Sequence, residues 1–149
     1  MLDAIQLSLD NLKLGGGPFG AVIVKDGEII SASANSVTRD NDPTAHAEVK
    51  AIREACKALN TFDLSGCTIY TSCEPCPMCL GAIYWAHLDN VYYGNNKTDA
   101  KKIGFDDSFI YDELEVPIDD RKIPFKQLMR DEALKAFQEW ENLENKIEY

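Results

Sequence analysis

Hydrophobic and polar positions follow two different periods along this chain, and each period predicts one kind of secondary structure. Between residues 2 and 14, apolar residues recur in steps of three and four, which predicts an amphipathic helix that ends at glycines 15–17. These apolar residues are Leu2, Ile5, Leu9 and Leu12. The next stretch, FGAVIVKDGEIISASAN, has two β-branched runs around Asp26-Gly27, a dipeptide that tolerates the positive φ values of a tight turn. The pattern therefore predicts a helix followed by an antiparallel pair of strands.

Helical and strand patterns alternate after this hairpin. AHAEVKAIREACKAL, residues 45–59, has an apolar stripe at helical spacing, and we expect Thr44 to cap its start. CTIYTS predicts a short strand, CPMCLGAIYWAHL predicts a helix, and NVYYG predicts another strand. Such alternation predicts an α/β fold, in which helices pack on the faces of a sheet.

The pattern is weaker from residue 95 onward. IPFKQLM, residues 123–129, predicts a last strand. The tail at residues 131–149 has apolar residues at helical spacing, so we expect an amphipathic helix that packs on its own domain or on a partner chain. No repeat or linker interrupts the 149 residues, which predicts a single domain spanning residues 1–149.

Composition and charge narrow the classes of function. Hydrophobic residues make up 45% of the chain without any run of about 18, so no membrane span is expected. The N-terminus lacks the basic start and apolar core of a secretory signal, which predicts a cytoplasmic protein. The net charge is −10, with 13 acids and 6 bases from Asp106 to Tyr149. Because nucleic-acid binding generally needs a basic face, we expect a neutral small molecule as the partner, and no nucleic acid.

Three of the five cysteines are equally spaced, at Cys73, Cys76 and Cys79. In a reducing cytosol such a cluster favours metal binding over disulfides. The spacing alone allows the first pair, the second pair or all three as ligands. Pro75 and Pro77 favour the second pair, because they place Cys76 at the cap of a new helix and Cys79 one turn inside it.

A second motif supplies the residue types that the first one lacks. His46-Ala47-Glu48 precedes Pro75-Cys76-Pro77-Met78-Cys79, and His-x-Glu followed by Pro-Cys-x-x-Cys marks the zinc deaminases that act on nucleobases. One imidazole and two thiolates leave the fourth position of a tetrahedral zinc site open to water, whose pKa zinc lowers towards about 7. A carboxylate beside the metal can then carry protons, and Glu48 is our candidate for this role.

These motifs lie within a longer resemblance, which runs from about residue 15 to the last residue. The chain resembles the cytidine deaminase-like superfamily, and bacterial guanine deaminases in particular, in GGPFGAVIVKDG, NDPTAHAEV, YTSCEPCPMCLGAIYWA, GFDDSFIY and the terminal EY. The resemblance implies a three-layer α/β/α fold with a mixed five-stranded sheet. It also implies a homodimer in which the tail at residues 131–149 is exchanged between subunits. The implied reaction is the hydrolysis of guanine, a cyclic amidine, to xanthine and ammonia, a step of purine catabolism and salvage.

The same resemblance assigns roles to individual residues. It implies that one zinc ion per chain is bound by His46, Cys76 and Cys79, and that Glu48 is the catalytic proton shuttle. The implied substrate-binding residues are Phe19, Asn35, Ala47, Asp107 and Tyr149. Among them, Phe19 would stack on the base and Tyr149 would close the site. Asn35 and Asp107 suit the polar edge of guanine, because an amide both donates and accepts hydrogen bonds and a carboxylate accepts them from N–H groups.

Three alternatives share some of these features. A tRNA adenosine deaminase would have the same metal site but would need a basic surface for RNA. A cytosine or triazine deaminase would differ in its pocket. A non-catalytic zinc module would use Cys73 together with His46, Cys76 and Cys79 in a closed site, and Glu48 would then have no role.

Overall fold

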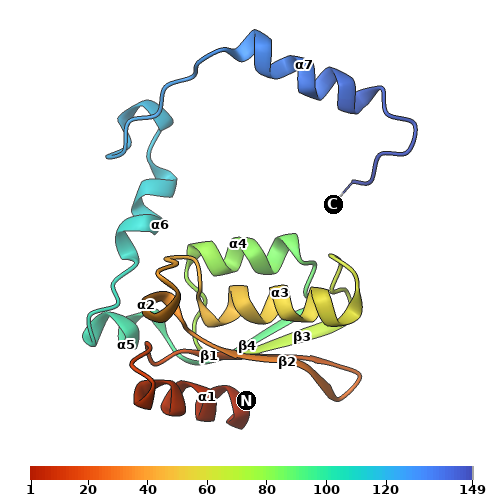
Figure 1. The fold of residues 1–149 in the computed structure, drawn as a ribbon. Coiled ribbons are helices and arrows are strands. Elements are labelled where there is room, and N and C mark those ends of the chain that lie inside the picture. Colours follow the sequence, from red (N-terminus) through yellow and green to blue (C-terminus); the bar gives the residue numbers. More distant parts are fainter. Residues whose placement is uncertain (149) are drawn as a thin grey trace. The chain divides into compact units, whose positions relative to one another are not determined.

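A computed structural model describes residues 1–148, which form two compact units, Met1–Asp107 and a second one that begins at Ser108 (Figure 1). The first unit is built on a four-stranded sheet with the order β2-β1-β3-β4. Its strands are β1 (Gly20–Lys25), β2 (Glu28–Ala34), β3 (Cys67–Cys73) and β4 (Asn90–Asn95). Strand β1 is antiparallel to both of its neighbours, whereas β3 and β4 are parallel, so the sheet is mixed as expected.

Helices cover both faces of this sheet (Figure 1). Helix α1 (Leu2–Lys13) packs on one face, and α3 (Ala47–Leu59) and α4 (Pro77–Trp85) pack on the other. Two short helices, α2 (Val37–Asp40) and α5 (Lys97–Lys102), complete the first unit. The three-layer α/β/α arrangement of this unit is therefore confirmed.

The second unit contains two helices and one helical turn. These are α6 (Ser108–Glu115), the 3-10 turn η1 (Ile118–Asp120) and α7 (Arg130–Glu141), so the helix expected in the tail is present. The fifth strand expected from the resemblance is wrong for the described part of the chain, and residues 123–129 form no strand. Pro124 has no N–H to give to a ladder, and Met129 has a left-handed φ of 52°, which does not fit an extended strand.

The predicted hairpin turn forms between β1 and β2. Asp26 and Gly27 both have positive φ, at 50° and 84°, as a two-residue hairpin loop requires. The main core then lies between the sheet and helices α3 and α4, and it is built from aliphatic and small side chains. Fully buried members include Ile23, Ala51, Ala55, Leu64 and Ile69. The alanines of α3 let this helix lie close to the strands.

Helix α1 forms as predicted, but its apolar stripe faces solvent. The exposed fractions of Leu2, Ile5, Leu9 and Leu12 lie between 38% and 82%, whereas the buried residues of the helix are Ala4, Ser8 and Asn11. The reason is close packing on β1, where a Cβ added to Gly20 would contact Ala4 O and lie 2.8 Å from Leu7 Cβ. Small residues must therefore occupy the inner face of α1. No helix formed by residues 1–148 is long and apolar enough to cross a membrane.

This close packing predicts the effect of adding a methyl group to β1. We expect Gly20→Ala to lower the free energy of unfolding by about 1–3 kcal/mol, because the new methyl overlaps the backbone of α1. The matched control is Gly81→Ala in α4, where an added Cβ meets no atom within 4 Å, and which should raise stability by up to about 1 kcal/mol. Urea denaturation followed by circular dichroism measures both. Equal stability of the Gly20→Ala variant and the wild type would contradict this packing.

Candidate active site and metal centre

Two of the expected metal ligands are the N-cap residues of neighbouring helices. His46 caps α3 and Cys76 caps α4, with Pro77 in the first turn and Cys79 one turn inside, as the prolines predicted. The expected capping role of Thr44 is wrong. Helix α3 begins at Ala47, three residues further on, and the Thr44 hydroxyl instead donates to Asp42 Oδ1 at 2.7 Å. Both ligands thus lie where free N–H groups and the positive ends of helix dipoles favour anionic groups.

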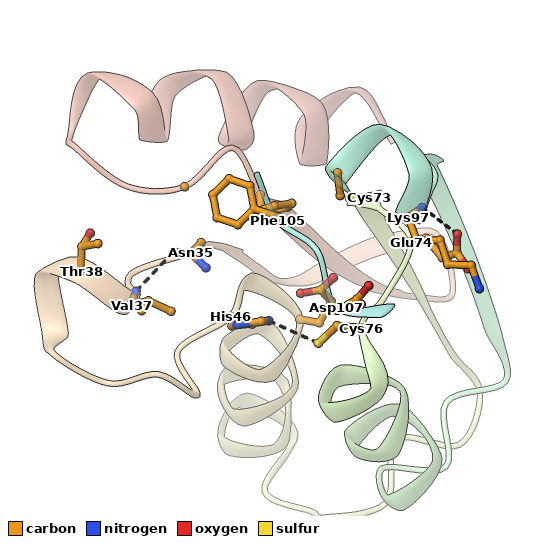
Figure 2. Close-up of a pocket in the computed structure, with 14 residues that line it drawn as sticks. Asn35, Val37, Thr38, His46, Cys73, Glu74, Cys76, Lys97, Phe105 and Asp107 are labelled. Carbon is orange, nitrogen blue, oxygen red and sulfur yellow. Dashed lines mark hydrogen bonds between the residues drawn. The ribbon is translucent and has the colours of Figure 1, made fainter. Parts of the chain in front are cut away.

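The imidazole of His46 is close to two sulfur atoms, and Figure 2 shows its contact with that of Cys76. Its Nδ1 is 3.5 Å from Cys76 Sγ and 3.4 Å from Cys79 Sγ, and the three ligand atoms all lie within 4.8 Å of one another. In a tetrahedral zinc site, bonds of about 2.0 Å to nitrogen and about 2.3 Å to sulfur separate these atoms by about 3.6 Å. The spacing and chemistry of the three residues therefore fit zinc.

The two cysteines differ in their affinity for a proton. A hydrogen bond from Cys79 lowers the pKa of Cys76 to about 4, and the same bond raises the pKa of Cys79. A hydrogen bond with Cys76 also raises the pKa of His46. Cys76 is therefore a thiolate at neutral pH without metal, and this negative charge favours the binding of a cation.

Cys73 lies beside this cluster but is not part of it. Its side chain is buried, its Sγ donates to the backbone oxygen of Asn96 at 3.8 Å, and burial raises its pKa to about 11. Among the described residues, the ligand atoms that lie within 4.8 Å of one another belong to His46, Cys76 and Cys79, and Cys73 is not in this set. This arrangement favours a three-residue site with an open fourth position over a site closed by Cys73.

Glu48 is a buried carboxylate next to the cluster. Only 5% of the residue is exposed. Its Oε1 accepts a hydrogen bond of 2.9 Å from the Thr71 hydroxyl, and its Oε2 accepts one of 3.5 Å from Cys79 Sγ. Burial raises the pKa of Glu48, which brings the protonated form closer to neutral pH. A carboxyl group in this position can both accept and release a proton.

A cavity of about 250 Å³ opens over these residues (Figure 2). Phe19, Asn35 and Asp107 line it together with His46, Glu48 and Cys76, so the structure brings most of the predicted site residues together. The ring of Phe19 packs edge-on against Phe105, with 4.9 Å between the ring centroids. Burial raises the pKa of Asp107. The volume lies just below the range of about 300–1,000 Å³ for drug-sized ligands, which suits a molecule as small as a single base.

Two predicted substrate residues are not placed at this cavity. Ala47 does not line it, because its side chain is fully buried in the core cluster. Tyr149 lies outside the described residues. Residues that the sequence did not predict also line the cavity, among them Val37, Thr38, Lys97 and Phe105. Phe105 could have been predicted, because it is an aromatic residue only two positions before Asp107 within GFDDSFIY.

Comparison with known proteins agrees with this fold and site. Residues 1–95 match the family model described as the cytidine and deoxycytidylate deaminase zinc-binding region. The chain belongs to this family of zinc-dependent deaminases. Within it, the chain is 58% identical to the guanine deaminase of Bacillus subtilis (strain 168) over 147 residues, which cover 98% of this chain and 94% of that protein. The crystal structure of the Bacillus subtilis guanine deaminase matches with a TM-score of 0.95 over the same shares of the two chains.

More distant relatives match a smaller part of the chain. The tRNA-specific adenosine deaminase of Aquifex aeolicus (strain VF5) is 52% identical over 79 residues, which cover 53% of this chain and 52% of that protein. A solved structure of a point variant in complex with 8-azaguanine is 34% identical, with a TM-score of 0.68, and the match covers 70% of this chain and 61% of that one. Zinc is the cofactor of the family to which these similarities assign the chain.

Proposed function

We propose that this chain is a zinc-dependent guanine deaminase, which hydrolyses guanine to xanthine and ammonia in the cytoplasm. The observation that carries the proposal is the 58% identity to a guanine deaminase over nearly the whole of both chains. The three-ligand cluster, the adjacent buried carboxylate and the small cavity above them supply the chemistry that this reaction needs.

His46, Cys76 and Cys79 would hold the zinc ion, and Glu48 would move the protons. When bound, zinc lowers the pKa of a water molecule in its fourth position to about 7 and so supplies a nucleophile at neutral pH. Replacing the amino group by water requires one proton for a ring nitrogen and one for the departing amine. The Oε2 atom of Glu48 would carry these protons, since Oε1 is held by Thr71 and a zinc-bound Cys79 thiolate would no longer donate to Oε2. The raised pKa of Glu48 eases both uptake and release.

The walls of the cavity would recognise the base. Phe19 offers an aromatic surface for stacking, and its edge-on contact with Phe105 holds the ring in place. Asp107 would accept hydrogen bonds from N–H groups of guanine, while the Asn35 amide can donate and accept. Ala47, through its backbone, and Tyr149, which lies outside the described residues, are also proposed as substrate residues.

We further propose that the protein acts as a homodimer, in which residues 1–149 make up one deaminase domain and the tail at residues 131–149 is exchanged between subunits. Two observations support association. The apolar stripe of α1 is exposed, and so are apolar residues of α7, with Phe137 at 74% and Trp140 at 41%. Exposed apolar faces of this kind usually mark contacts with another chain.

The acidic charge of the chain favours a free base over tRNA as substrate. A tRNA adenosine deaminase is the closest rival, because it shares the metal-binding motif. The net charge of −10 gives the phosphate backbone of RNA little to bind. Cytosine and triazines remain rival small substrates, which differ from guanine in ring size and in the groups that Asp107 would meet.

The proposal is tested by measuring ammonia release from a panel of substrates. We expect the purified, zinc-loaded protein to deaminate guanine with a kcat/KM above about 10⁴ M⁻¹s⁻¹, at the low end of the range for efficient enzymes. Adenine, cytosine, cytidine and a tRNA anticodon stem with adenosine at the wobble position should react at least 100-fold more slowly. Turnover of the tRNA stem without turnover of guanine would overturn the proposal. Failure on every substrate would favour a structural zinc module.

A further inference from the structure

One side of the cavity is fixed by a fully buried asparagine that does not line it. Asn11, in the last turn of α1, is 1% exposed and lies on the buried face of the helix with Ala4 and Ser8. Burying an amide costs free energy unless its hydrogen bonds are made. Asn11 makes three, because its Nδ2 donates to the backbone oxygens of Gly17 and Asn35 at 2.7 and 2.8 Å, and its Oδ1 accepts from Arg39 at 2.9 Å.

Arg39 reaches the same carbonyl from α2. While its Nη1 donates to Asn11, its Nη2 donates to the backbone oxygen of Asn35 at 3.4 Å. The carbonyl of Asn35 is therefore held by two side chains from two helices. Asn35 and Gly17 both line the cavity, whereas Asn11 and Arg39 do not.

Backbone hydrogen bonds extend this network to Phe19. The amide of Phe19 donates to Gly17 O at 2.8 Å, and the amide of Asn35 donates to Phe19 O at 3.0 Å. Gly17, Phe19 and Asn35 are thus linked to one another, and two of the three are tied to Asn11. The side chain of Asn35 keeps its own orientation through a bond of 3.3 Å from the amide of Val37 to its Oδ1.

Two adjacent glycines make this arrangement possible. A Cβ at Gly16 would lie 2.7 Å from both Cγ and Oδ1 of Asn11, so a larger residue there would push the carboxamide out of place. A Cβ at Gly17 would lie 3.2 Å from the Phe19 ring and 3.5 Å from Asn35 Oδ1. Gly16 and Gly17, which follow α1, therefore let Asn11 reach the cavity wall.

We propose that Asn11 and Arg39 are positioning residues, which set the base-recognising side of the cavity by holding the backbone of Gly17 and Asn35. The proposal rests on the proposed function, in which Phe19 and Asn35 contact the base. Neither residue touches the metal ligands or Glu48, so losing them should weaken the binding of the base and leave the chemical step largely intact.

The test compares Arg39→Ala with Arg53→Ala, a control that removes an exposed arginine from α3. Arg39 is exposed, so its variant should fold and keep its zinc. We expect Arg39→Ala to raise the KM for guanine about tenfold, as for a lost hydrogen bond to a charged donor, with kcat changed less than about twofold. Arg53→Ala should change neither. Asn11→Ala should give a larger rise in KM, together with a lower melting temperature because its site is buried.

Hydrogen exchange tests the network in the protein without substrate. In Arg39→Ala, the amides of Phe19 and Asn35 should exchange about tenfold faster, while that of Ile69 in β3 should not change. If Arg39→Ala matched Arg53→Ala in either KM or exchange, the positioning role would be wrong. If the wild type failed to deaminate guanine, the proposed function would fall. In that case, hydrogen exchange of the Phe19 and Asn35 amides in Arg39→Ala would by itself decide whether the network holds the cavity wall.

Discussion

Replacing Glu48 with glutamine is expected to slow ammonia release from guanine by about 10²–10⁴-fold while zinc remains bound. Glutamine has the shape of glutamate and can still accept the hydrogen bond from Thr71, so the site should keep its geometry. An amide cannot take up a proton and pass it on, so proton transfer is the step that is lost. Turnover of guanine and zinc content per chain, measured on the same sample, check this result.

The same helix offers a matched control for this variant. Glu54 of α3 accepts a hydrogen bond of 2.7 Å from the Ser33 hydroxyl, much as Glu48 accepts one from Thr71, but it does not line the cavity. Glu54→Gln should therefore retain turnover within about twofold of the wild type. If Glu48→Gln retained comparable activity, Glu48 would have no part in the mechanism.

Cys79→Ser is expected to lose zinc, and with it all measurable turnover. The Cys79 sulfur is fully buried, 3.4 Å from the His46 nitrogen, and a serine hydroxyl is a far poorer zinc ligand than a thiolate. Two ligands would remain, at the starts of two helices. Metal analysis after gel filtration should give one zinc ion per chain for the wild type and close to none for the variant.

Cys73→Ser separates the open site from a closed one. Because the Cys73 thiol bonds to a backbone oxygen outside the three-ligand cluster, its serine variant should keep one zinc ion per chain. Addition of a chelator should lower the melting temperature of the wild type and of Cys73→Ser, because bound metal stabilises the folded state. It should not change that of Cys79→Ser, which holds no metal to remove. Equal loss of zinc from both serine variants would mean that Cys73 is a ligand.

The sequence predicted the secondary structure well where one local signal dominated. The Asp26-Gly27 turn and the proline-led start of α4 are short-range features, and both formed as expected. The apolar stripe of α1 gave the helix but not its orientation, because the close approach of Gly20 to Ala4 decides which face is buried. The expected fifth strand came from the resemblance and from the apolar pattern of residues 123–129, but Pro124 lacks an N–H and Met129 has a left-handed φ.

The parts of the candidate site that come from short sequence motifs could be predicted, whereas the parts that come from distant segments of the chain could not. His46, Glu48, Cys76 and Cys79 belong to two short motifs whose spacing reflects single helix starts. The parts of the cavity lining supplied by Thr38 and Lys97 could not be predicted from the sequence, because these residues lie in α2 and α5, which are far apart in the chain and meet at one cavity only through the order of the strands. The role of Asn11 could not be predicted for a similar reason, because its hydrogen-bond partners are 6, 24 and 28 residues away in the sequence.

The proposed zinc ligands and Glu48 all lie in the first two thirds of the chain, whereas two of the proposed substrate residues lie in the last third. The family match ends at residue 95, after all three candidate ligands and Glu48, whereas Asp107 and Tyr149 lie beyond it. Substitutions after residue 95 would therefore change only part of the proposed base-recognising wall, since Phe19 and Asn35 lie within the match, and they would leave the proposed zinc ligands and Glu48 in place.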